Sequence, residues 1–235
     1  MESETITAIA TALSPSGIGI VRISGSEALD IADKVFRNKN GLKVNVKSFE
    51  SHTVHYGFIF DGEDMIDEVL LIVMRAPRSY TTEDTVEINC HGGPYILRKV
   101  LEAVIKNGAR LAEPGEFTKR AFMNGRIDLT EAESVMELIS SKNEFSRRNS
   151  LKTLRGSVYD KISEIRDKIL HEAAFIEAAL DDPEHYSLDN YSDKLIATAI
   201  EIKKDIERLI MKSSSGRLMS EGISTVIVGK PNVGK

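Results

Sequence analysis

The first strand signal along the chain is an alternation of apolar and polar residues from Ile18 to Ser24. Val21 and Ile23 fall on one side of this period-two pattern, and Arg22 falls on the other. A half-buried strand has this pattern, because successive side chains point to opposite faces of a sheet. We therefore expect Arg22 to lie on the face opposite the buried row.

A helix is predicted directly after this strand. Apolar residues recur at helical spacing over 28–36. Ser24 and Glu27 precede it with the spacing of a capping box, in which each side chain bonds a free backbone N–H of the other residue.

Two further apolar segments predict a β-hairpin. The even-numbered residues from Val54 to Phe60 are all apolar or aromatic, and a near-continuous apolar run covers 69–74. Asp61 and Gly62 between them are a turn signal. We expect the first strand to be half-buried and the second to be central in its sheet.

The strand predicted over 85–91 places three polar residues on one face, and Glu87 is among them. Cys90 falls on the apolar face, and we interpret it as a core residue rather than a metal ligand. Gly92-Gly93 then lead into a helix that starts at Pro94. Free N–H groups at such a start favour a ligand site, and a plain turn is the alternative.

Residues 113–133 form the junction between a mixed α/β half and a helical half. Pro114-Gly115 interrupts the chain, a short helix follows, and Asn124-Gly125 ends it. Thr130 and Glu133 have the spacing of a capping box, so we expect them to start the next helix.

Arg126 and Asp128 lie on the connector between those two helices. Charges on a tight connector are usually solvated surface groups. The alternative is a ligand site at the junction, where two domains could close over a bound molecule.

Three long apolar patterns follow the junction and predict an all-α domain. The pattern over 151–180 continues past Gly156 and predicts one helix of about 45 Å at 1.5 Å per residue. A break at Asp181-Asp182-Pro183 separates it from a helix over 191–211, and we interpret 213–216 as a linker. A bundle core explains the apolar stripes better than a coiled coil, because no matching charge code accompanies them.

The last residues return to a strand pattern. Residues 223–228 are mostly apolar, and 229–235 match G-x-x-x-x-G-K, the phosphate-binding loop. The backbone N–H groups of such a loop cradle phosphates, and Lys235 reaches the β and γ oxygens. The Ser or Thr that binds Mg²⁺ does not follow within the sequence. We expect these 235 residues alone to contain no catalytic residue and neither to hydrolyse a nucleoside triphosphate nor to bind it tightly.

Composition restricts the class of protein. The chain has 235 residues, 41% of them hydrophobic and 29% charged, which suits a globular protein of one or two domains. A formal net charge of -5 argues against a protein whose whole surface grips nucleic acid. One cysteine excludes an internal disulfide, and no apolar run reaches membrane-spanning length, so we expect a cytoplasmic protein with no membrane partner.

Four blocks together resemble the MnmE family of tRNA modification GTPases, also called TrmE. They are GIGIVRISG at 17–25, DTVEINCHGGP at 84–94, EPGEFTKRAFMNGRIDLTEAE at 113–133 and GKPNVGK at 229–235. The third block is long and specific, whereas the fourth alone indicates only a P-loop NTPase.

The resemblance implies a multidomain α+β and α architecture. We expect a folate-binding and dimerisation domain over 1–118, the first part of a helical domain over 119–219, and over 220–235 the first strand and P-loop of an α/β GTPase domain. The resemblance also implies a homodimer and a heterotetramer with the FAD-containing protein MnmG.

The implied activity is that of a GTP hydrolase in tRNA processing. With MnmG, the family adds an aminomethyl or carboxymethylaminomethyl group at C5 of the wobble uridine of tRNA. A 5-formyl- or 5,10-methylene-tetrahydrofolate supplies the one-carbon unit, and the cofactors are GTP, K⁺ and Mg²⁺. The alternative function is a folate-binding or scaffold module without GTPase activity.

The resemblance also implies site residues. Those expected to bind folate are Arg22, Glu87 and Arg126, although a structural salt bridge of Glu87 with one of the arginines is the alternative. Those expected to bind GTP are Asn232, Val233, Gly234 and Lys235, and Asn232 also binds potassium.

Overall fold

The computed structural model describes residues 4–221, 226, 228 and 229. They belong to two compact units, Met1–Ile127 and Asp128–Lys235, which meet nine residues after the expected boundary at 118. The expected phosphate-loop residues Asn232, Val233, Gly234 and Lys235 lie outside the described residues.

The amino-terminal unit is built on one mixed sheet of strand order β3-β4-β5-β6-β2-β1-β7. Only the β1 and β7 pair is parallel among the described strands. The strands are β1 (Ile6–Ile9), β2 (Ser16–Ser24), β3 (Phe36–Asn38), β4 (Thr53–Asp61), β5 (Asp64–Met74), β6 (Thr85–Gly92) and β7 (Arg110–Leu111).

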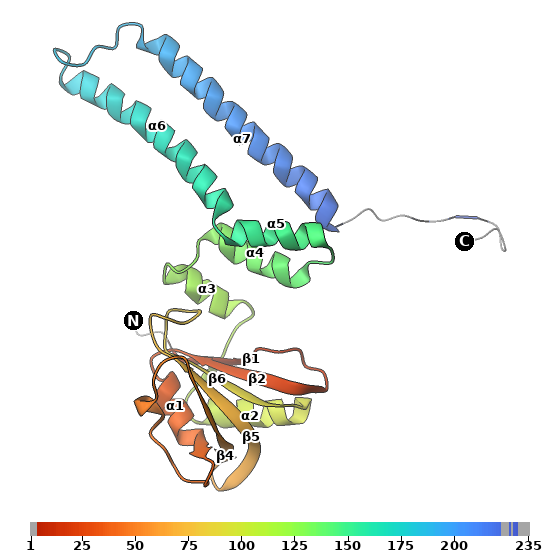
Figure 1. Ribbon diagram of the computed structural model, residues 1–235. Helices are drawn as coiled ribbons and strands as arrows, with labels where there is room; N and C mark the ends of the chain where they lie inside the picture. Colours follow the sequence, from red (N-terminus) through yellow and green to blue (C-terminus); the bar gives the residue numbers. More distant parts are fainter. Residues whose placement is uncertain (1–3, 222–225, 227, 230–235) are drawn as a thin grey trace. The chain divides into compact units, whose positions relative to one another are not determined.

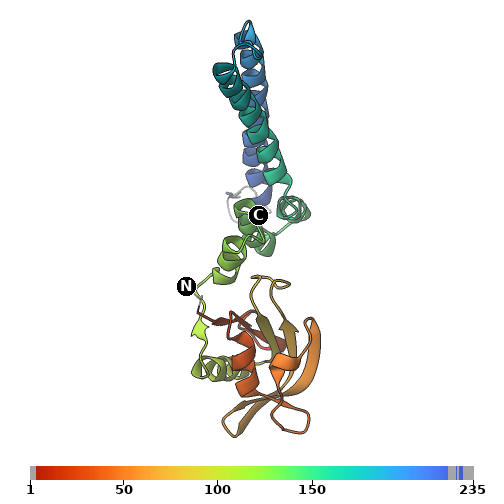
Figure 2. The ribbon, with the colours of Figure 1, turned by 90° about the vertical axis from the view of Figure 1, so that its left-hand side faces the viewer.

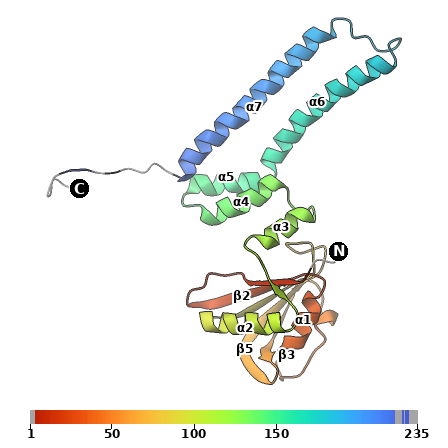
Figure 3. The same cartoon turned by 180° about the vertical axis from the view of Figure 1, so that it is seen from behind.

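Two helices cover one face of this sheet, α1 (Ala28–Val35) and α2 (Pro94–Lys106), as Figures 1 and 3 show from opposite sides. The sheet residues beneath them are completely buried, and the helices contribute Ile31 and Leu97 to the same core. A short 3₁₀ turn, η1 (Val46–Ser48), adds one more buried residue, Val46. Helix α3 (Glu116–Met123) ends at Asn124, as the sequence predicts.

The predicted hairpin is confirmed and its first strand is half-buried as expected, but the buried side is not the one that carries Val54 and Tyr56. Gly57 and Ile59 face the core, whereas Val54 and Tyr56 are 57% and 48% exposed. The period-two pattern separates two faces without showing which one meets the helices. Gly57 decides it, because a Cβ there would lie 2.1 Å from the Arg37 carbonyl oxygen.

The capping box expected for Ser24 and Glu27 is also wrong. Ser24 ends β2 and is completely buried, so its hydroxyl is in the sheet rather than at the helix start. The free N–H of Glu27 instead donates to the Thr5 hydroxyl at 3.0 Å. A side chain from β1's end therefore replaces the local cap, because α1 begins after a turn at Gly25.

The second unit is helical, as predicted. Its described helices are α4 (Leu129–Ser140), α5 (Glu144–Leu154), α6 (Ser157–Asp181) and α7 (Tyr191–Glu221). Helices α6 and α7 form an antiparallel hairpin (Figures 1 and 2), and the Lys168 ammonium on α6 pairs with Glu201 on α7 at 2.6 Å.

Helix α4 starts with a different capping box from the expected one. Asp128 is the N-cap and accepts from the Glu131 backbone N–H at 2.8 Å, while Glu131 accepts from the Asp128 N–H at 2.8 Å. The Thr130 hydroxyl donates to Asp128 at 2.7 Å and is already inside the helix. Asp128 rather than Thr130 is the N-cap, because it precedes Thr130 and its carboxylate is a favourable capping group.

Two further expectations for this unit are wrong. Gly156 ends the α5–α6 pattern, because its φ of 80° is the left-handed conformation that stops helices and suits glycine. Residues 213–216 continue α7 instead of forming a linker. Serines and one glycine cost helix propensity, but no proline interrupts the backbone hydrogen bonds there.

The apolar stripes of α6 and α7 remain largely exposed. Ile162 and Ile169 on α6 are each 50% exposed, and Ile196 on α7 is 57% exposed. Tyr191 makes the clearest contacts between the two helices, because its ring stacks on Phe175 with centroids 4.6 Å apart and its hydroxyl donates to the buried carboxylate of Glu172. The described helices alone therefore do not enclose the expected bundle core.

We predict that the cap of α4 is worth about 1 kcal/mol. Asp128→Ala removes the carboxylate that bonds the Glu131 N–H, so the free energy of unfolding of the helical unit falls by that amount. Urea unfolding followed by circular dichroism measures it. Glu133→Ala is the control, and a loss for Glu133→Ala without one for Asp128→Ala would restore the Thr130–Glu133 box.

Candidate functional site

An arginine–glutamate pair lies on the sheet face that α1 and α2 leave uncovered. Arg22 on β2 is directly opposite Glu87 on β6 in the strand register. The Arg22 Nε donates to Glu87 Oε1 at 2.8 Å, and Nη2 lies 2.7 Å from the same oxygen. Glu87 Oε2 has no hydrogen-bond partner among the described residues, so one carboxylate oxygen is oriented and the other remains available.

Two aromatic rings flank this pair. The Arg22 guanidinium carbon lies 5.9 Å from the centroid of the Tyr80 ring and 5.5 Å from that of Phe117. On the other side, the Arg126 guanidinium carbon lies 5.0 Å from the Tyr80 centroid, and Arg126 donates to the Tyr80 carbonyl at 3.2 Å. Tyr80 therefore contacts both arginines and brings the three expected folate residues into one site.

Tyr80 and Phe117 were not among the site residues expected from the sequence. Phe117 is an apolar position of a short helix, and Tyr80 lies in an irregular loop, so neither has a periodic signal. The only clue is an aromatic residue among the polar residues of the loop over 79–84.

The loop that carries Tyr80 is held in place by several hydrogen bonds. The Asn124 amide donates to the Thr81 carbonyl at 2.7 Å, and the Ser79 hydroxyl donates to the Glu83 carbonyl at 2.6 Å. The Tyr80 hydroxyl lies 3.0 Å from that of Thr118 on α3. The ring is thus fixed at both its backbone and its hydroxyl.

A network of ion pairs joins this loop to α3 and to the first strand's end. Arg120 on α3 donates to both carboxylate oxygens of Glu83 at 3.1 Å, and it also lies 3.1 Å from Glu116. Glu116 pairs in turn with Arg110 at 2.7 Å, and Arg110 pairs with Glu4 at 2.7 Å. The side chains of Arg120, Glu83 and Glu116 are only 10–15% exposed.

These hydrogen bonds lower the pKa of Glu116 to about 2, chiefly through the Arg110 guanidinium. Burial opposes the shift, and it is outweighed by Arg110, Arg120 and the backbone N–H of Glu113. The carboxylate is therefore ionised throughout the physiological pH range and serves as an anchor for two arginines.

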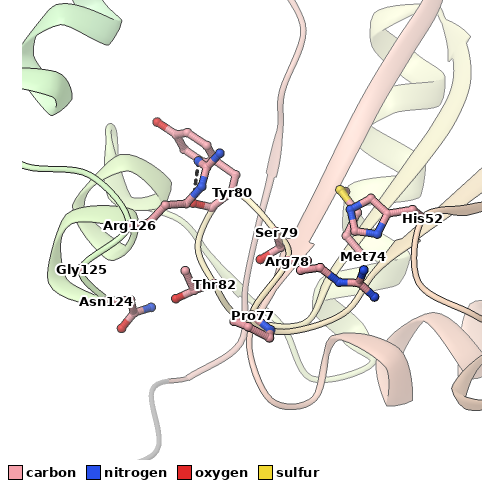
Figure 4. Close-up of a pocket in the computed structure, with 10 residues that line it drawn as sticks. All are labelled: His52, Met74, Pro77, Arg78, Ser79, Tyr80, Thr82, Asn124, Gly125 and Arg126. Carbon is pink, nitrogen blue, oxygen red and sulfur yellow. Dashed lines mark hydrogen bonds between the residues drawn. The ribbon is translucent and has the colours of Figure 1, made fainter. Parts of the chain in front are cut away.

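A groove of about 440 Å³ lies beside this site, and Figure 4 shows its lining. Tyr80 and Arg126 lie at one end in that view, and His52 and Arg78 lie toward the other. The lining residues are His52, Met74, Pro77, Arg78, Ser79, Tyr80, Thr82, Asn124, Gly125 and Arg126.

The Cys90-His91 dipeptide is not part of this site. The Cys90 thiol is buried, and burial raises its pKa to about 11, as suits a core residue. The His91 Nδ1 lies 2.7 Å from Asp67, which raises the pKa of this imidazole. Across the described residues, no group of three or more His, Cys, Asp or Glu side chains could hold a metal ion.

The pair Gly92-Gly93, at the end of β6, has a structural explanation. A Cβ at Gly92 would lie 2.6 Å from the Ser16 carbonyl oxygen and 2.7 Å from that of Ile18, so only glycine allows β2 to approach this closely. Gly93 precedes α2 as its N-cap. Close strand packing accounts for the first glycine without a ligand.

The chemistry of the site is that of recognition. It combines one oriented carboxylate, two guanidinium groups and two aromatic rings on a rigid loop and sheet. Such a set suits a flat, polar heterocycle with attached carboxylates, because the rings stack, the carboxylate reads N–H donors and the arginines bind anions.

Comparison with known proteins agrees with the motifs of the sequence. The family model described as "GTP-binding protein TrmE N-terminus" matches residues 5–126, and the model described as "MnmE helical domain" matches residues 129–228. The chain belongs to the MnmE family, also called TrmE. The expected architecture, a mixed-sheet unit followed by a helical unit, is that of the two MnmE family models.

Several curated MnmE relatives match the whole chain. Proteins named tRNA modification GTPase MnmE are 56% identical over 235 residues in Lachnoclostridium phytofermentans, 49% over 237 in Thermoanaerobacter pseudethanolicus and 47% over 235 in Bacillus licheniformis. These alignments cover 99–100% of the chain and 51% of each relative. The chain therefore spans about half the length of the MnmE relatives it matches.

Among its described helices, none is both long and apolar enough to cross a membrane.

We predict that Glu116→Gln lowers the free energy of unfolding by roughly 1.5–3 kcal/mol at pH 7, because it weakens hydrogen bonds to two arginines. The pKa of Glu116 falls from 4.5 to about 2 on folding, so its contribution is complete above pH 4.5 and is lost as the pH falls towards 2.

Urea unfolding of Glu116→Gln and of a control variant, each compared with the unsubstituted chain between pH 7 and pH 3, tests this. Glu113→Gln is the matched control, because Glu113 is exposed and its carboxylate contacts no described group. The prediction would be contradicted if both substitutions lowered the free energy of unfolding equally. It would also be contradicted if the difference between them did not shrink as the pH falls.

Proposed function

We propose that the chain is part of a tRNA modification GTPase whose amino-terminal unit binds a tetrahydrofolate. The observation that supports folate binding is that Arg126 and Arg22 both contact the Tyr80 ring, while Arg22 is also paired with Glu87. The name shared by relatives up to 56% identical supports GTPase activity in tRNA modification.

The proposed reaction requires one further protein and a one-carbon donor. Together with the FAD-containing partner MnmG, the protein would add an aminomethyl or carboxymethylaminomethyl group to C5 of the wobble uridine of tRNA. The bound 5-formyl- or 5,10-methylene-tetrahydrofolate would supply the one-carbon unit. The proposed compartment is the cytoplasm, because the single cysteine suits a reducing environment.

The proposed nucleotide site rests on sequence. The G-x-x-x-x-G-K pattern suits a phosphate cradle in which Lys235 reaches the β and γ oxygens and Asn232 takes part in binding K⁺. Val233 and Gly234 would contribute backbone N–H groups to GTP, with Mg²⁺ as the second cation. This loop also favours the GTPase over the alternative of a folate-binding scaffold without enzymatic activity.

The folate proposal follows from the geometry of the Arg22–Glu87 pair. Arg22 Nε and Nη2 both engage Oε1 of Glu87, which leaves the lone pairs of Oε2 to accept from the amino-pyrimidinone edge of a pterin. The Tyr80 and Phe117 rings supply apolar surface for the flat ring system. Arg126 supplies a cation for a carboxylate of the glutamate part.

We predict that Glu87→Gln weakens binding of 5-formyltetrahydrofolate by roughly 1.5–3 kcal/mol, the range for hydrogen bonds to a charged group. Isothermal titration calorimetry gives the affinity, and thermal unfolding gives the stability. The melting temperature should change little, because Arg22 is the one described partner of Glu87 and the carbonyl oxygen of Gln can still accept from its guanidinium.

The matched control is Glu102→Gln on α2, which removes an exposed carboxylate on the far side of the sheet. It should leave folate affinity unchanged. Unchanged affinity in Glu87→Gln together with a clear loss of stability would make the Arg22–Glu87 pair a structural salt bridge.

We propose in addition that the protein is a homodimer through the uncovered face of the sheet. Tyr56 on β4 is paired with Leu70 on β5, and they are 48% and 46% exposed. Val54, at 57% exposure, extends the same apolar surface. Strand β3 pairs with 57–59 of β4, and the exposed apolar side chains lie on the face of the sheet, so we place the contact on this face.

We predict that Leu70→Glu converts a dimer into a monomer, because it places a charge in the middle of this apolar surface. Analytical ultracentrifugation at micromolar concentration measures the change. Leu42→Glu is the control, since Leu42 is also exposed but lies in the loop after β3. A monomeric unsubstituted chain, or a dimer that survives Leu70→Glu, would contradict the proposal.

A further inference from the structure

The groove beside the Arg22–Glu87 pair carries positive charge without a matching acid. No Asp or Glu is among its lining residues, whereas two arginines, Arg78 and Arg126, are. The exposed Arg78 guanidinium makes no hydrogen bond or ion pair with any described residue, and Arg126 bonds only the carbonyl and ring of Tyr80. Both cations are therefore available to an anionic ligand.

This contrasts with the other arginines near the site. Arg22 is paired with Glu87, Arg110 with Glu116 and Glu4. The unit thus neutralises its other site arginines with carboxylates and leaves two guanidinium groups open in one groove. Two open arginines suit a ligand with several carboxylates or phosphates, because each guanidinium can bind an oxyanion bidentately.

The size and floor of the groove favour an extended ligand. A volume of about 440 Å³ is within the range of small-molecule clefts and exceeds what one isolated anion fills. Met74 and Pro77 give it apolar surface, while Ser79, Thr82 and Asn124 add polar groups. A chain with methylene groups between its anions matches this alternation better than a compact phosphate does.

The groove is continuous with the proposed folate site. Tyr80 belongs to both, since its ring contacts Arg22 and it also lines the groove. Met74 lies two residues along β5 from Ile72, and Ile72 is paired with Glu87. Two residues of a strand span about 7 Å, so the groove begins one side-chain row from the carboxylate.

We infer that this groove holds the γ-linked glutamate tail of a polyglutamylated tetrahydrofolate, with Arg126 near its start and Arg78 further along. The inference rests on the proposed folate function and names the form of the ligand. Each added glutamate adds two methylene groups and one carboxylate, which fits a groove with an apolar floor and spaced arginines. A monoglutamate that reaches only Arg126 would leave Arg78 unused.

The test compares monoglutamyl and pentaglutamyl 5-formyltetrahydrofolate by calorimetry on the 235-residue chain. We expect the pentaglutamate to bind about tenfold more tightly, as one charge-assisted hydrogen bond allows. Arg78→Gln should abolish this gain and leave the monoglutamate affinity unchanged. Arg98→Gln, which removes another exposed arginine without a described partner on α2, should keep the gain.

The outcomes separate this inference from the folate proposal itself. If neither form binds, both fail. If the monoglutamate binds but the pentaglutamate is no tighter, or its gain survives Arg78→Gln, only the tail site is overturned. If Arg78→Gln instead weakens tRNA binding and spares the gain, the groove is a phosphate-backbone contact and the inference is likewise overturned.

Discussion

The amino-terminal unit depends on a network of ion pairs. Its centre is formed by Arg120 and Glu116, two residues of α3. Their side chains are nearly buried, and each has at least two oppositely charged partners. A buried charge without a partner costs several kcal/mol, so α3 and the loop over 79–84 hold their positions together or not at all. The network thus joins the loop and α3 into a rigid support for the Tyr80 ring.

That support explains why the candidate site lies at one end of an otherwise open sheet. Helices α1 and α2 cover the face that carries Val21 and Ile88. On the opposite face, the described residues cover only the part near the loop and α3, because the loop and α3 contact the sheet there. They reach the row of Arg22 and Glu87, where the aromatic rings reduce solvent contact. Further along the same face, apolar side chains remain exposed, so ligand recognition and subunit association would share one surface.

The helical unit illustrates a different balance. Its helix ends are well specified by caps, with Asp128 and Asn143 accepting backbone N–H groups and Gly156 in a left-handed conformation. Its apolar stripes are much less satisfied, because two long helices side by side can cover only one stripe each. Helix formation here is a local property, whereas burial requires more helices than the described residues supply.

The sequence by itself determined most of the helices and longer strands, the hairpin, the membership of the MnmE family and the faces on which Arg22 and Glu87 lie. These are local properties, since periodicity, turn residues and contiguous motifs are properties of short segments. Only the tertiary structure decided which side of β4 is buried, that Thr5 rather than Ser24 caps α1, and that Tyr80 joins the arginines. Those outcomes depend on contacts between residues far apart in the chain, such as Arg120 with Glu83, and no short pattern encodes such contacts.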